Sequence, residues 1–68
     1  MNEIHFIVEE SPEGGYIARA VAAAIFTEAD DWSSLREQVR DAVRCHFEDA
    51  DRPSLIRLRI SREETIAA

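Results

Sequence analysis

Apolar and polar residues alternate near the N-terminus, and this period of two predicts a β-strand. Ile4, Phe6 and Val8 would face one side of a sheet, and the residues between them the other side. The run Ser11-Pro12-Glu13-Gly14-Gly15 then predicts a hairpin turn. Pro12 suits the first central position of a type I turn, and a glycine can take the left-handed conformation that ends a three-residue loop with a bulge.

The second strand is expected to place small side chains opposite large ones. The register that we predict pairs Val8 with Tyr16, Phe6 with Ala18 and Ile4 with Ala20. Because alanines occupy little space beside Phe6 and Ile4, a helix could lie close to this face of the sheet.

The middle of the chain predicts a short strand and then the helix. A bend over residues 22–24 leads into Ile25-Phe26-Thr27, which favours a strand. Asp30 or Asp31 would then cap a helix from about Trp32 to Phe47. Apolar positions with helical spacing give this helix one buried face: Leu35, Val39, Ala42, Val43, His46 and Phe47.

The chain closes with one more predicted strand, from Leu55 to Ile60, after Pro53 ends the preceding segment. Residues 61–68 would form a frayed tail or a segment that docks on a partner. The order of elements indicates an α+β fold in a single domain, residues 1–68. We expect an antiparallel sheet of three to four strands with one amphipathic helix packed on one face.

Length and composition limit how this domain can be stabilised. A chain of 68 residues buries only about 60% of the surface that it exposes when unfolded. One cysteine allows no intrachain disulfide, and His5, Cys45 and His46 lack the spacing of a zinc site, so we expect neither a metal nor another cofactor. Self-association into a dimer or tetramer is therefore predicted.

The sequence shows no membrane or export signal. It contains no apolar run of about 20 residues, and its first residues lack the cationic segment of a signal peptide. We therefore expect a cytoplasmic protein with no membrane partner.

The net charge favours a basic partner, whereas a local arginine stripe could favour an acidic one. The formal charge of −6 disfavours nonspecific binding to phosphate backbones and suits a basic protein, although it also fits simple solubility. Arg36, Arg40 and Arg44 make a cationic stripe on the exposed side of the helix. That stripe is either a solvated, salt-bridged surface or a contact for RNA or an acidic protein.

Motifs in the same order resemble the small HicB-like antitoxin domain. The resemblance covers residues 4 to 60 and is carried by the segments Ile7-Val8-Glu9-Glu10, Glu13-Gly14-Gly15-Tyr16-Ile17-Ala18-Arg19 and Thr27-Glu28-Ala29-Asp30. It implies a partial ribonuclease-H-like fold and an antitoxin that covers a small basic ribonuclease, a HicA-like toxin. The chain departs from the pattern at residues 20–24, where alanines replace a loop rich in proline and glycine. It also ends before a C-terminal DNA-binding module, so DNA binding is not expected.

Catalysis is not expected from these residues. The acidic side chains are predicted in turns, at the helix cap and along a solvent face, and not converging on magnesium as a ribonuclease-H enzyme requires. Cys45 sits beside the apolar face of the helix and is expected to be a small buried hydrophobe. A nucleophilic role is not expected, because adjacent residues on a helix point about 100° apart and His46 is poorly placed to activate it. His46 itself is expected to pack on the apolar edge of the helix.

One surface stands out as a candidate interface. A single helix covers only one face of the sheet, so the other face should carry an apolar strip with a charged rim. The candidate residues are His5, Ile7, Ile17, Arg19, Val21, Arg57 and Arg59. Ile7 and Ile17 are direct neighbours in the predicted register. The function that we expect is that of a HicB-like antitoxin. The alternative is a free-standing homo-oligomer with a regulatory or small-ligand role and no toxin.

Overall fold

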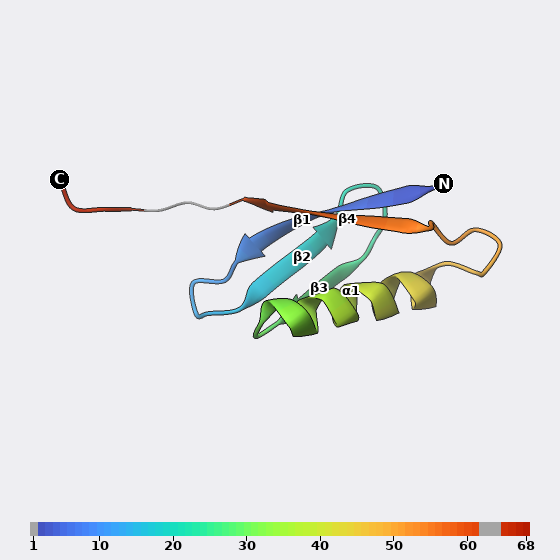
Figure 1. The fold of residues 1–68 in the computed structure, drawn as a ribbon, viewed down its shortest axis with the longest axis horizontal. Coiled ribbons are helices and arrows are strands. Elements are labelled where there is room, and N and C mark those ends of the chain that lie inside the picture. The colour runs from blue at the N-terminus through green and yellow to red at the C-terminus, as the bar shows by residue number, and fades with distance from the viewer. Residues whose placement is uncertain (1, 62–64) are drawn as a thin grey trace.

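In the part of the chain that the structure describes, four strands form one sheet and a single helix packs against it (Figure 1). The computed structural model describes residues 2–61 and 65–68. Its elements are β1 (Glu3–Glu10), β2 (Tyr16–Ala20), β3 (Phe26–Ala29), α1 (Trp32–His46) and β4 (Leu55–Ser61). The predicted α+β fold and the predicted order of elements are confirmed.

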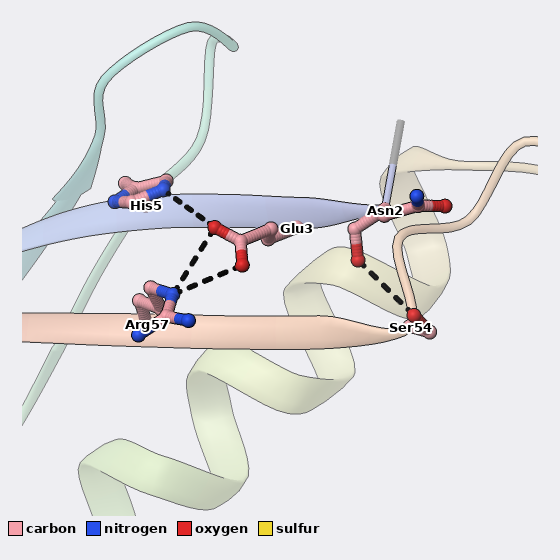
Figure 2. Close-up of polar contacts among 5 residues, drawn as sticks. All are labelled: Asn2, Glu3, His5, Ser54 and Arg57. Atoms are coloured by element: carbon pink, nitrogen blue, oxygen red, sulfur yellow. Dashed lines mark hydrogen bonds and ion pairs between the residues drawn. The ribbon is translucent and has the colours of Figure 1, made fainter.

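The sheet has the order β3-β2-β1-β4 and is mixed. β1 pairs antiparallel with β2, and β2 with β3, whereas β4 runs parallel to β1. The start of β4 is fixed beside the start of β1, because the amides of Ser54 and Leu55 donate to the carbonyl of Asn2 at 3.0 and 3.1 Å. The Ser54 hydroxyl donates to the same oxygen at 3.1 Å (Figure 2).

The register of the hairpin differs from the predicted one by two residues. Phe6 pairs with Ala20, and Val8 with Ala18. Pairing continues into Ser11, whose amide donates to the carbonyl of Gly15 at 3.0 Å, so the turn begins later than predicted. Because the offset is even, every side chain keeps its predicted face, and large residues still lie opposite alanines.

Both glycines of the turn have positive φ, 97° for Gly14 and 85° for Gly15. Gly15 also lies against the neighbouring strand. A Cβ at this position would be 2.6 Å from the backbone oxygen of Ala29. Glycine is therefore required at Gly15 both by its backbone conformation and by the close approach of β3.

The core lies between α1 and one face of the sheet. Asp31 caps the helix by accepting a hydrogen bond from the Ser34 amide at 2.7 Å, and Phe47 is the C-terminal cap, so the helix ends one residue before the predicted end. The buried apolar residues are Ile4, Phe6, Val8, Ala18, Ala20, Ile25, Leu35, Val39 and Val43.

The predicted burial of Cys45 and His46 is wrong, since both are exposed. The buried stripe of α1 is narrow: Leu35, Val39 and Val43 follow one another at intervals of four residues. Cys45 comes two residues after Val43, about 200° around the helix, and so lies off the buried stripe, beside a hollow that Ala24, Ile25 and Phe26 also line. His46 rests edge-on against the ring of Phe47, with 4.8 Å between the ring centroids.

The predicted tail, residues 61–68, falls partly outside the described residues. Ser61 is the last residue of β4. Residues 65–68 are exposed, have no regular secondary structure and lie well away from the sheet (Figure 1). Residues 62–64 of the predicted tail are not described.

Candidate functional site

The face of the sheet turned away from α1, here called the open face, holds all seven predicted interface residues. Alternation along the strands places them there: His5 and Ile7 from β1, Ile17 and Arg19 from β2, and Arg57 and Arg59 from β4. Val21 continues the alternation of β2, and its amide donates to the His5 carbonyl at 2.9 Å.

Large apolar side chains are accessible on this face. The exposed fractions are 36% for Ile7, 63% for Val21, 63% for Phe26 and 55% for Leu55, while Ile17 is half-buried. Such a group on one side of a small domain is characteristic of a surface that another molecule covers.

Apolar and charged residues are interleaved here, which differs from the predicted strip with a rim. One row across the four strands reads Arg59, Ile7, Arg19 and Phe26. Ile7 and Ile17 are not direct neighbours as predicted, because Ile7 pairs with Arg19 and Ile17 pairs with Glu9. They lie diagonally on the same face, a consequence of the two-residue difference in register.

Several charges of the open face are held by partners. The Arg57 Nε donates to both carboxylate oxygens of Glu3 at 3.1 Å, and His5 Nε2 lies 3.1 Å from Glu3 Oε2 (Figure 2). The hydrogen bond from Arg57 holds the pKa of Glu3 below its usual value, and the contact with His5 acts in the same direction. Glu9 and Arg19 form a looser pair at 3.8 Å. Among the described residues Arg59 makes no ion pair.

One end of the sheet gathers acidic residues from three segments. Glu10 pairs with Tyr16 and Tyr16 with Ala29, so the turn between β1 and β2 lies beside the end of β3 and the start of α1, at the left of Figure 1. We call this the acidic pole: Glu9, Glu10, Glu13, Glu28, Asp30 and Asp31. Four of its side chains, from Glu13, Glu28, Asp30 and Asp31, line one open hollow.

The net charge of the protein is concentrated in the part that forms this pole. Residues 1–31 hold seven acidic residues and one arginine, whereas residues 32–68 hold seven of each. The formal charge of −6 therefore comes from the first part of the chain. A basic partner would be attracted to the acidic pole more strongly than to α1 or β4.

Two residues of the open face were missed by sequence reasoning, Phe26 and Leu55. Alternation separates Phe26 from Ile25 and Thr27 but does not say which of them faces the helix; the structure buries Ile25 and Thr27 and leaves Phe26 on the open face. The signal for Leu55 was its alternation with Arg57 and Arg59. Both residues enlarge the apolar part of the open face toward the sheet edges.

The described residues also bear on metal binding and on membrane insertion. Among residues 2–61 and 65–68, no three His, Cys, Asp or Glu side chains are grouped so that they could share a metal ion. No helix in that part of the chain combines the length and the apolar character needed to span a membrane.

Comparisons with known proteins identify relatives of this chain. A UPF0150 protein of Thermotoga maritima is 45% identical over 65 residues, which cover 96% of this chain and 91% of the relative. A UPF0150 protein of Archaeoglobus fulgidus is 52% identical over 50 residues, 74% of each chain. No family model and no solved structure matches. The name of these relatives states no activity, ligand or partner, so the resemblance to HicB-like antitoxins stays a prediction. Identity at this level over nearly the whole length shows that the chain belongs to the UPF0150 family.

Proposed function

We propose that this UPF0150 protein is a non-catalytic protein-binding module that self-associates and acts as a HicB-like antitoxin, neutralising a small basic ribonuclease. The observation that carries the proposal is the open face, where Ile7, Phe26 and Leu55 are exposed beside charged residues. When a partner covers a surface of this kind, apolar side chains are removed from water, and this favours the complex. A toxin that cleaves cellular RNA acts in the cytoplasm, so the proposal places the antitoxin there as well.

The acidic pole supports a basic partner. Opposite charges on two proteins raise the rate at which they associate, and salt reduces that gain. Glu9 and Glu28 lie on the open face, on either side of Ile17. A basic toxin attracted to the pole would therefore contact the open face at Ile17, next to the part around Ile7 and Phe26 that a second copy would cover.

The alternative is a free-standing homo-oligomer with a regulatory or small-ligand role. The small core favours self-association in either case, because a second copy could cover the open face and bury the side chains that α1 leaves exposed. The two functions differ in one respect. Only the antitoxin requires a second, basic protein.

Co-expression with the product of the adjacent gene tests the antitoxin function. We expect the wild-type protein to retain that product in a pull-down and to suppress its ribonuclease activity. The triple variant Glu9→Lys, Glu10→Lys and Glu13→Lys should bind more slowly at low salt, and the difference should shrink as salt is added. A matched control reverses three acids outside the pole: Glu37→Lys, Glu48→Lys and Asp49→Lys.

Two results would count against the antitoxin. If the pole and control variants bound and neutralised equally at low salt, the electrostatic account would fail. If no co-encoded protein bound at all, the toxin would be excluded and the homo-oligomer would remain.

A further inference from the structure

The outer edge of the sheet is formed by a long strand. β4 is last in the order β3-β2-β1-β4, and no strand pairs with its outer side in the described part of the chain. It is seven residues long and contains no proline. An edge of this kind presents N–H and C=O groups along its length, and a further extended segment can pair with them.

A groove runs between this edge strand and the helix. α1 packs mainly against β3 and β2, and so lies toward the edge of the sheet opposite β4. Ile56 and Leu58 are consequently only half-buried, and Ile60 is 43% exposed. Two adjoining hollows, which share Arg40 and Ile56, form what we call the β4 groove: one reaches Arg36, Val39 and Leu58, the other Val43, Arg44, Arg52, Pro53, Ser54 and Leu55.

Arginines line both sides of the β4 edge. Arg36, Arg40 and Arg44 follow one another at intervals of about one turn of α1 and line the β4 groove. Within the described residues Arg36 and Arg40 make no ion pair, while Arg44 lies 3.9 Å from Asp41. Arg57 and Arg59 project from the other face of β4. A segment added to this edge would therefore meet guanidinium groups on both of its faces.

We propose that the β4 edge binds an extended acidic segment of another protein by strand addition. Its backbone pairs with the free edge of β4, and its carboxylates bind Arg36 and Arg40 on the helix side and Arg59 on the open side. Guanidinium and carboxylate groups match in geometry and form charge-assisted hydrogen bonds. The apolar floor of Ile56 and Leu58 accepts a branched side chain from the same segment. This surface differs in place and in charge preference from the acidic pole.

Two other occupants fit the surface less well. A second copy pairing through its own β4 would bring Arg57 and Arg59 against the same two residues, and like charges across strands are destabilising. Proteins that bind single-stranded nucleic acid commonly stack its bases on aromatic side chains. Among the described residues, none that lines the β4 groove is aromatic.

Synthetic peptides test the proposal on the full-length protein. The probe is fluorescein-labelled Glu-Glu-Val-Val-Glu-Glu, which carries carboxylates and a valine on each face when extended. One control peptide replaces the glutamates by lysines. A second control keeps the charges but has every backbone nitrogen methylated, so neither of its edges can pair as a strand. Binding is followed by fluorescence anisotropy at low and physiological salt.

The expected result has three parts. The glutamate probe binds saturably and more weakly as salt rises, the lysine peptide does not bind, and methylation weakens binding by about tenfold or more. Arg36→Gln with Arg40→Gln weakens binding by a further factor of about ten or more, since it removes two charge-assisted contacts. Arg19→Gln, on the open face but away from β4, leaves binding unchanged. Circular dichroism confirms that each variant is folded.

Several outcomes would overturn the proposal. It fails if the glutamate probe shows no saturable binding at millimolar concentration, or if the methylated peptide binds as well as the probe. It fails as well if a uridine oligonucleotide binds the groove more tightly, or if the double arginine variant only dissociates an oligomer of this chain. Substitutions at Ile7, at Phe26 or at the acidic pole leave peptide binding intact, so failure of the proposed function is seen separately.

Discussion

The two faces of the sheet are built from the same strands by the same alternation, yet they differ in what covers them. On one face Ile4, Phe6 and Val8 are buried beneath α1. On the other, Ile7 and Phe26 remain accessible among arginines and glutamates. Burial of apolar side chains on the covered face stabilises the fold, whereas the apolar side chains of the open face remain accessible to a partner. Because α1 covers only one face of the sheet, stability and binding are assigned to opposite faces.

The largest effect is expected on the covered face, at Leu35. Leu35→Ala removes a fully buried side chain that packs between α1 and the sheet, and should lower the free energy of unfolding by about 2–5 kcal/mol. Ser33→Ala, at an exposed position of the same helix, should be close to neutral. Chemical denaturation measures both. Equal, small effects would contradict the assignment of the buried stripe.

The next effect concerns Gly15, where β2 meets β3. Gly15→Ala should cost about 2–4 kcal/mol, because alanine is strained at positive φ and its Cβ would collide with the Ala29 oxygen. Gly14→Ala is the matched control. Gly14 also has positive φ but no atom near the added Cβ, so only the strain of about 1–2 kcal/mol applies. Thermal or urea unfolding would show the difference, and equal costs would mean that the close approach is unimportant.

On the open face the expected change is in assembly. Ile7→Thr with Phe26→Thr removes two accessible apolar side chains while keeping residues that favour strands. Sedimentation should show the wild-type protein as a dimer or larger at micromolar concentration and the double variant as a monomer, with a small change in stability. Ile66→Thr, which alters an exposed residue outside this face, is the control. A wild-type monomer would remove the self-association prediction.

The smallest effect is expected from Glu3, which is partnered but accessible. Because the hydrogen bond from Arg57 lowers the pKa of Glu3 in the folded protein, the ionised carboxylate stabilises the fold above the usual value of 4.5. That contribution is lost as the pH falls through the lowered pKa. Glu3→Gln should therefore be slightly less stable than wild type at neutral pH, and the difference should vanish in acid.

Urea denaturation at several pH values measures the effect at Glu3. Glu37→Gln, on the exposed side of α1, is the comparison, because Glu37 makes no ion pair in the described part of the chain. A difference between wild type and Glu3→Gln that grew as the pH fell would contradict the role of Arg57.

The elements could be predicted because their signals are local. Alternation at Ile4, Phe6 and Val8, the acidic cap at Asp31 and the glycines after Pro12 each act over a few residues, and each is found where it was predicted. The register was misplaced because it depends on how far pairing continues into the turn. The hydrogen bond between Ser11 and Gly15 extends the pairing into the turn, and no single residue type in the sequence predicts this hydrogen bond.

In the candidate site, too, some features follow from local sequence and others only from the tertiary structure. Sequence alternation alone assigned His5, Ile7, Arg57 and Arg59 to one face, because neighbouring residues of a strand point to opposite sides. Only the tertiary structure decided that β4 lies parallel to β1 at the sheet edge, that α1 leaves this edge uncovered, and that Arg36 and Arg40 border a groove. Such features depend on contacts between segments far apart in the chain, and the pattern within each segment does not fix them.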